Sequence, residues 1–127
     1  MLTSKEMTAI AVKALDDKMA KEIKVLEVRE LTVLTEYFVI CTAGSTAQVK
    51  TLSDELSRVL EEKGEETRRV EGRRDGGWIL VDFGCLVVHI FLDEQRKFYN
   101  LERLWGDAPE IGQEELLKLA EEISDRD

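Results

Sequence analysis

The sequence is poor in the residues that metal centres, disulfide scaffolds and imidazole catalysis require. Its 127 residues include one histidine, one proline and two cysteines. Two cysteines are too few for a disulfide scaffold, and we expect both to be reduced thiols. No apolar run approaches the ~20 residues that cross a bilayer. The N-terminal segment carries acids and lacks a signal-peptide core, so we expect a cytoplasmic protein that does not bind membranes.

Basic residues are also in deficit, with 18 Lys and Arg against 27 Asp and Glu, for a net charge of -9. Phosphate backbones attract basic surfaces, so little direct nucleic-acid binding is expected. The charge favours a basic protein as partner and would speed its capture, although acidity also simply keeps a domain soluble. Residues 110–127 hold seven acids and two bases, a net of -5, which leaves -4 for the preceding 109 residues. We therefore divide the chain into a domain over 1–106 and an acidic helical extension over 107–127.

The remaining pattern is that of a single α/β domain long enough to bury a core. Apolar residues at helical spacing predict helices over about 4–20, 46–63 and 111 to the end, and a short one over 93–99 that Asp93 can cap. Thr3 with Glu6, and Ser45 with Gln48, have the spacing of capping boxes. Runs rich in β-branched residues predict strands over 23–28, 37–43 and 67–71. Residues 29–36 carry no clear pattern.

Residues 76–91 form the centre of the chain: two apolar strands that flank Gly84, as in a hairpin. Because the runs are apolar almost throughout, we expect helices to cover both of their faces. Alternation places Trp78, Leu80 and Asp82 on one face of the first strand. An indole N–H and a carboxylate on such a face each need a polar partner, within the fold or on another molecule.

Aromatic residues gather in the last third of the domain and are absent from the first third. Clustered Trp and Tyr beside Arg are typical of interface hot spots, and they also fill ordinary cores. Composition alone favours neither the interface nor the core interpretation. The clustered residues are Trp78, Phe91, Phe98, Tyr99 and Trp105.

A metal centre would have to use Cys41, Cys85 and His89, the only soft ligands in the chain. On one strand, residues 85 and 89 would lie ~13 Å apart at ~3.3 Å per residue. One zinc ion cannot reach both at ~2.0–2.3 Å, and no fourth ligand is evident. We therefore expect no metal and no other cofactor.

The Gly44-Ser45 pair lies at a strand–helix junction, where phosphate can bind and where nucleotidyltransferases carry a Gly-Ser element. Such enzymes need carboxylates clustered on a neighbouring strand to hold two metals. The helix offers only Asp54 and Glu55, which would face solvent. A glycine turn with a serine cap is the favoured interpretation. Since a nucleophile also needs a base and the only imidazole is that of His89, catalysis is not expected.

Four segments together give the sequence a specific resemblance. They read Gly-Trp-Ile-Leu-Val-Asp-Phe-Gly at 77–84, Val-Val-His-Ile-Phe at 87–91, Arg-Lys-Phe-Tyr-Asn-Leu-Glu-Arg-Leu-Trp at 96–105, and Tyr-Phe-Val-Ile-Cys-Thr-Ala-Gly-Ser at 37–45. Over roughly residues 4–106 the chain closely resembles the ribosomal silencing factor RsfS, or Iojap-like, family. It departs from the family pattern at Cys85, where an acidic residue is expected, and in the extension after residue 106.

The resemblance implies a mixed five-stranded sheet flanked by helices, nucleotidyltransferase-like but without catalytic carboxylates. It further implies binding to the large ribosomal subunit through ribosomal protein number fourteen, a block to subunit joining, and a possible homodimer through an overlapping surface. The alternative function is that of a degenerate or cryptic nucleotidyltransferase. A third possibility is a plain scaffold protein that forms homodimers. The residues expected at the partner surface are Trp78, Leu80, Asp82, His89, Phe91, Tyr99, Leu104 and Trp105.

Overall fold

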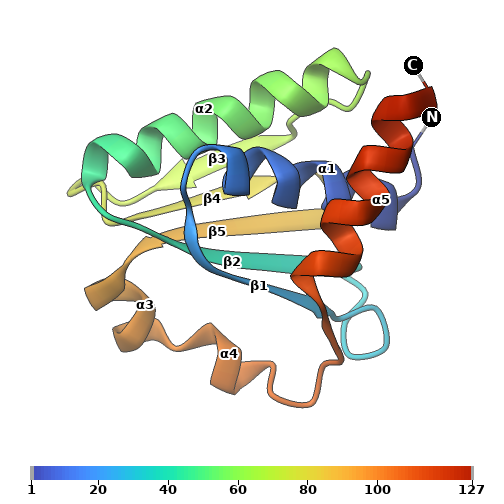
Figure 1. Ribbon diagram of the computed structural model, residues 1–127. Helices are drawn as coiled ribbons and strands as arrows, with labels where there is room; N and C mark the ends of the chain where they lie inside the picture. Colours follow the sequence, from blue (N-terminus) through green and yellow to red (C-terminus); the bar gives the residue numbers. More distant parts are fainter. Residues whose placement is uncertain (1, 127) are drawn as a thin grey trace.

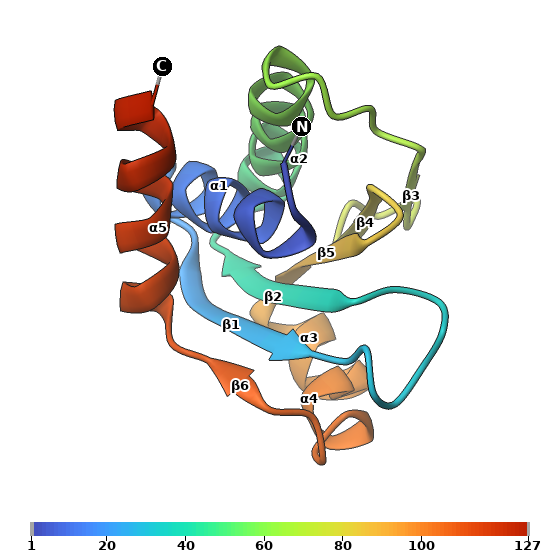
Figure 2. The same ribbon diagram turned by 90° about the vertical axis from the view of Figure 1, so that its right-hand side faces the viewer.

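The protein is a single α/β domain in a computed structural model that describes residues 2–126 (Figure 1). Its six strands form one mixed sheet in the order β3-β4-β5-β2-β1-β6. Helices α1, α2 and α5 lie on one side of the sheet, and the short α3 and α4 lie on the other (Figure 2). No helix within the described residues is long and apolar enough to cross a membrane. The elements in order are α1 (Ser4–Asp17), β1 (Lys21–Glu27), β2 (Tyr37–Ala43), α2 (Thr46–Glu62), β3 (Arg69–Gly72), β4 (Trp78–Asp82), β5 (Leu86–Leu92), α3 (Asp93–Tyr99), α4 (Leu101–Leu104), β6 (Glu110–Ile111) and α5 (Gln113–Arg126).

The predicted fold class is confirmed, with one strand more than expected. Strands β2 and β5 pair in parallel, and every other neighbouring pair in the sheet is antiparallel. The sixth strand is β6, a two-residue segment that pairs with β1 through Val25 and Leu26. Two residues after a proline carry no alternation of their own, so the sequence pattern offered no signal for this strand.

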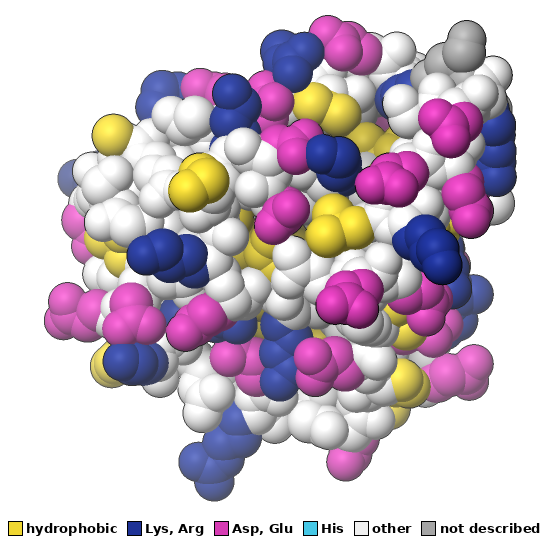
Figure 3. Space-filling model, viewed as in Figure 1, with side chains coloured by type: hydrophobic (Ala, Val, Ile, Leu, Met, Phe, Trp, Pro, Cys, Tyr) yellow, Lys and Arg dark blue, Asp and Glu magenta, His cyan; other side chains and the backbone are white. Residues whose placement is uncertain are grey.

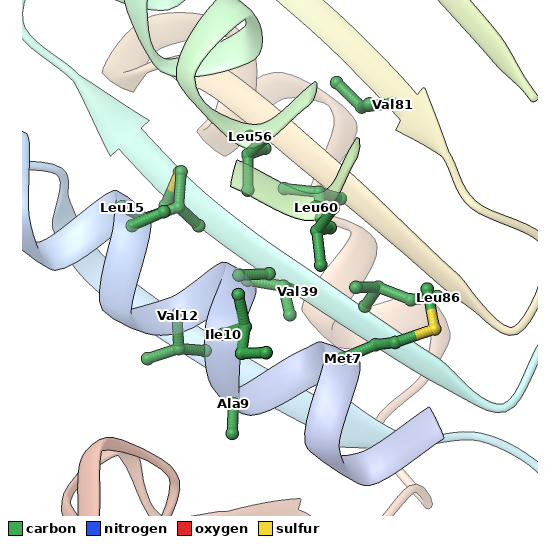
Figure 4. Close-up of a cluster of buried hydrophobic side chains, with 14 of the residues drawn as sticks. Met7, Ala9, Ile10, Val12, Leu15, Val39, Leu56, Leu60, Val81 and Leu86 are labelled. Atoms are coloured by element: carbon green, nitrogen blue, oxygen red, sulfur yellow. The ribbon is translucent and has the colours of Figure 1, made fainter. Parts of the chain in front are cut away.

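The helical side of the sheet holds the main core. Thr3 and Glu6 make the predicted reciprocal capping box at the start of α1. The small residues Ala9 and Ala11 are fully buried, which lets α1 lie close to the sheet. Side chains of α1 and α2, among them Ile10 and Leu56, meet above Val39 of β2 (Figure 4). The surface in the view of Figure 1, which takes in both layers of helices, mixes acidic and basic residues, with apolar side chains in small separate patches (Figure 3).

Helix α1 ends at Asp17, earlier than the predicted residue 20. The chain turns at Met19, whose φ of 69° lies in the left-handed region and stops the helix. No glycine marks this turn, so the sequence alone gave no reason to end the helix there.

The acidic extension packs into the same core as the rest of the chain. Leu116, Ala120 and Ile123 of α5 are buried among the residues of α1 and β1. Exposed ion pairs from Lys5 to Glu115 and from Arg126 to Glu6 lie beside this contact. The packing therefore continues across the division that we placed at residue 106, and α5 covers the β1 side of the sheet as a structural part of the domain.

The β4–β5 hairpin turns at Gly84, as expected. The φ of Gly84 is +90°, which glycine adopts without strain, and Asp82 Oδ1 accepts a hydrogen bond from its N–H at 2.8 Å. Val81, Val88 and Ile90 face the helices and are buried. The expectation that both faces would be covered is wrong for the other side. Helices α3 and α4 cover only part of it and leave Leu80 half-buried.

Replacing Leu116 with Ala should lower the unfolding free energy by about 2–5 kcal/mol, because it opens a cavity between α5 and the sheet. The matched control is Glu122→Gln on the exposed side of α5, which should change stability by less than about 0.5 kcal/mol. Urea unfolding of both variants measures the difference. Equal, small effects would mean that α5 is the charged appendage that its composition suggests.

Candidate functional site: a half-covered aromatic face

The half-covered side of the sheet carries a cluster of rings and aliphatic side chains that we call the aromatic face. The register of β4 and β5 sets Trp78 opposite Phe91 and Leu80 opposite His89. Phe38 enters from β2, and Tyr99 and Trp105 come from the α3–α4 segment. Five elements thus bring these residues to one surface. The aromatic face consists of Phe38, Trp78, Leu80, His89, Phe91, Tyr99 and Trp105.

The rings of the aromatic face contact one another in a continuous series. Trp78 stacks on Phe91 with centroids 4.9 Å apart and lies 4.6 Å from the ring of Tyr99. At the other end, Trp105 meets Phe38 edge to face at 5.1 Å, and Phe38 meets His89 at 5.4 Å. Each such pair contributes about 0.5–1.5 kcal/mol beyond the area it buries. The rings are therefore held in place before any partner arrives.

His89 supplies the polar partner for the indole of Trp78. Trp78 Nε1 donates a hydrogen bond to His89 Nδ1 at 3.2 Å. Burial lowers the pKa of His89 to about 4, so the ring is neutral at pH 7. A neutral ring that accepts at Nδ1 carries its proton on Nε2. His89 is therefore a buried hydrogen-bond acceptor within the fold. This role accounts for the histidine without assigning it as a catalytic base or a metal ligand.

Asp82 also finds its partners inside the chain. Besides accepting from the Gly84 N–H, its carboxylate lies 3.6 Å from the guanidinium of Arg69 on β3. The polar requirements of Trp78 and Asp82 that the sequence raised are both met locally. The open part of the face can therefore meet an apolar partner surface without leaving these groups unpaired.

Exposure separates the expected site residues into two layers. Phe91 is fully buried and His89 is 5% exposed, so both lie beneath the surface and support it. Leu104 is 72% exposed at the rim. The others are half-buried, and each presents part of its side chain to solvent: Trp78, Leu80, Asp82, Tyr99 and Trp105.

Phe38 was not among the expected site residues, and two further features of the face were missed by sequence reasoning. Arg73, in the turn after β3, donates a hydrogen bond to Tyr99 Oη, and its guanidinium lies 5.8 Å from the centre of that ring. Glu71, Gly72 and Arg73 border a shallow hollow of about 220 Å³ beside Trp78 and Leu80. Neither position follows a motif. The basic run of residues 68–74 was the only signal for a polar rim at this edge.

The rest of the described chain offers no catalytic centre. Ser45 Oγ accepts from Gln48 N and caps α2 as expected, whereas Gln48 Oε1 accepts from the Gly44 N–H and not from that of Ser45, so the predicted capping box is only half formed. Burial raises the pKa of Cys41 to about 12, and burial also raises that of Cys85, so neither thiol is activated. Among residues 2–126 no three His, Cys, Asp or Glu side chains come together as a metal site.

These observations define a class: an α/β binding protein that presents a preformed aromatic surface. Comparison with known proteins then gives the family. The whole chain, residues 1–127, matches the family described as ribosomal silencing factor during starvation, RsfS, and the protein belongs to that family. It is a family of regulatory proteins and not of enzymes.

Individual relatives agree with this assignment. The ribosomal silencing factor RsfS of Halalkalibacterium halodurans is 39% identical over 110 residues, which cover 87% of this chain and 94% of that protein. A crystal structure of a Chromobacterium violaceum protein matches with a TM-score of 0.80 at 36% identity, covering 83% of this chain and 88% of that one. The Mus musculus protein named mitochondrial assembly of ribosomal large subunit protein 1 is 33% identical over 97 residues, 74% of this chain and 42% of that protein.

The buried histidine predicts a pH dependence of stability. The folded pKa of about 4 lies below the ordinary value of 6.5, so between these values only the unfolded chain binds the proton. The unfolding free energy should therefore fall by about 3 kcal/mol from this group as the pH drops from 6.5 to 4. His89→Gln keeps an acceptor that does not titrate. Urea unfolding across this range should show a shallower loss for the variant, and parallel curves would contradict the assignment.

Proposed function

We propose that the protein binds the large ribosomal subunit through its aromatic face and sterically blocks joining of the small subunit, which represses translation. The docking site we propose is the basic ribosomal protein number fourteen. The observation that carries the proposal is the preformed, half-covered aromatic face in a member of a silencing-factor family. The name of the mouse relative, which refers to the large subunit, agrees with this choice of subunit.

Charge supports a protein as the landing site. A chain with a net charge of -9 is repelled by ribosomal RNA, whereas ribosomal proteins are basic. Apolar contact at the face would supply affinity, and long-range attraction would raise the association rate. Cytoplasm is the location we propose, because bacterial subunits join there.

Steric exclusion needs affinity and bulk but no active site. A domain of this size is about 25–30 Å across. Bound to a large-subunit protein near the joining surface, it would occupy volume that the small subunit requires. The effect would then be stoichiometric, with one copy blocking one large subunit. A second copy of the chain could occupy the same aromatic face, so homodimerisation would compete with binding.

Leu80→Glu tests the docking surface most cleanly. Leu80 presents its side chain on the aromatic face, whereas removal of Trp78 would also leave His89 without its hydrogen-bond donor. A carboxylate at Leu80 would be buried unpaired against an apolar partner, so binding to purified large subunits should weaken at least tenfold, or about 1.4 kcal/mol.

The matched control is Val70→Glu on the neighbouring strand β3. Val70 is 51% exposed and pairs with Val81, so its side chain belongs to the opposite face of the sheet. This variant should bind within about twofold of the unaltered protein, because an exposed side chain on the opposite face of the sheet would not contact the partner. Co-sedimentation with large subunits measures both. Equal binding by the two variants would exclude the aromatic face as the docking surface.

A further inference from the structure

We infer that Arg96 is a positioning residue for the aromatic face: it fixes the α3–α4 segment, which carries Tyr99, Leu104 and Trp105. The inference rests on the proposed function, because it concerns how that surface is held ready to bind. Arg96 itself does not reach the partner. It is 7% exposed and lies between the segment and the edge of the sheet.

The guanidinium of Arg96 joins three other elements to α3. Its Nη1 donates to the backbone carbonyl of Glu22 at 2.7 Å, at the start of β1, and to Thr42 Oγ1 at 2.8 Å, at the end of β2. Its Nε donates to Glu102 Oε2 of α4 at 3.3 Å. A planar group with donors in a fixed fork can hold three such acceptors at once, which a lysine ammonium cannot do in the same geometry.

The two helices of the segment do little by themselves to fix its conformation. Helices of seven and four residues are too short to be stable by themselves. Asp93 does not cap α3 as expected: the cap position falls at Leu92 and has no side-chain hydrogen bond. Arg96 is the only buried residue of α3, and α4 has none. Between the two helices, Asn100 turns the chain with a φ of 47°. The other contacts that place the segment are the ring contacts of Tyr99 and Trp105, the Arg73–Tyr99 hydrogen bond and the packing of Leu101 against the buried residues on this side of the sheet. Arg96 is the only one of these groups that ties α3, α4 and the ends of two strands together by hydrogen bonds.

The backbone that meets Arg96 is in an uncommon conformation. Glu22 has a φ of 50°, unusual for a residue other than glycine, at a register break in β1 between Lys21 and Lys24. Its carbonyl accepts the shortest of the Arg96 bonds. Its carboxylate is 70% exposed and 3.9 Å away, so it contributes little. Glu22 therefore contacts Arg96 mainly through its backbone carbonyl, and the identity of its side chain matters little.

Glu102 is the neutralising partner of the buried guanidinium. Its side chain is 24% exposed, and its second oxygen, Oε1, is buried without a hydrogen-bond partner. Such an oxygen is costly to bury. Loss of either partner would leave the other buried and uncompensated, which should release α4 together with Trp105.

Three variants test the inference: Arg96→Met, Arg96→Lys and Glu102→Gln. Each should weaken binding to purified large subunits, Arg96→Met by at least tenfold and Arg96→Lys by less. Amide hydrogen exchange of the free protein gives a second measurement that needs no partner. Exchange over residues 97–105 should accelerate at least tenfold in Arg96→Met while that of β2 and α1 is unchanged. If Arg96→Met does not fold, the same two measurements on Arg96→Lys and Glu102→Gln test the inference.

Controls separate positioning from general stability. Lys97→Met removes a neighbouring exposed cation that pairs with Asp93, and Glu22→Gln alters only the exposed carboxylate, so both should bind normally. Leu56→Ala destabilises the protein from the opposite side of the sheet and should bind normally wherever it is folded. Normal binding by Arg96→Met, or a loss of binding no larger than its unfolded fraction accounts for, would overturn the inference. If the unaltered protein does not bind, the proposed function fails, and the exchange measurement still decides the role of Arg96.

Discussion

The unequal covering of the sheet is the constraint on which the rest of the structure depends. Three helices cover the central strands on one side and hold the main core there, and the small residues of α1, such as Ala9 and Ala11, allow that close packing. The other side receives only the two short helices α3 and α4. Apolar side chains that a longer helix would have covered, among them Leu80 and part of Trp78, remain accessible. A stable core and an apolar binding surface thus share one sheet of six strands.

Internal pairing of polar groups prepares that surface for an apolar partner. Trp78 gives its N–H to His89, and Asp82 accepts from Gly84, so neither requires a polar group from outside. The series of ring contacts and the buried Arg96 fix the orientation of the remaining rings. Little conformational freedom is then left to lose on binding, which favours affinity for a given contact area.

Sequence patterns predicted the parts of the fold whose causes are local. The capping box at Thr3, the hairpin turn at Gly84 and the alternation along β4 each depend on residues a few positions apart. Where the cause lies far away in sequence, prediction failed or stayed open. The strand β6 exists because β1 offers it an edge, and α5 belongs to the core because α1 offers it an apolar face.

The candidate site divides in the same way. The motifs identified the family and supplied all the residues of the aromatic face except Phe38, and alternation placed Trp78 and Leu80 on one face. That Phe91 lies beneath Trp78 follows only from the pairing register of β4 with β5. The role of Arg96 could not be predicted from the sequence pattern, because its partners at residues 22 and 42 lie 74 and 54 positions away in the chain.

The central claim is that bound protein and small subunit compete for one volume on the large subunit. The most direct test adds the protein to separated subunits before mixing and follows the products by sedimentation. We expect fewer joined ribosomes, with saturation near one copy per large subunit, and resistance when the subunits are joined first. Normal joining by large subunits that demonstrably carry the protein would contradict it.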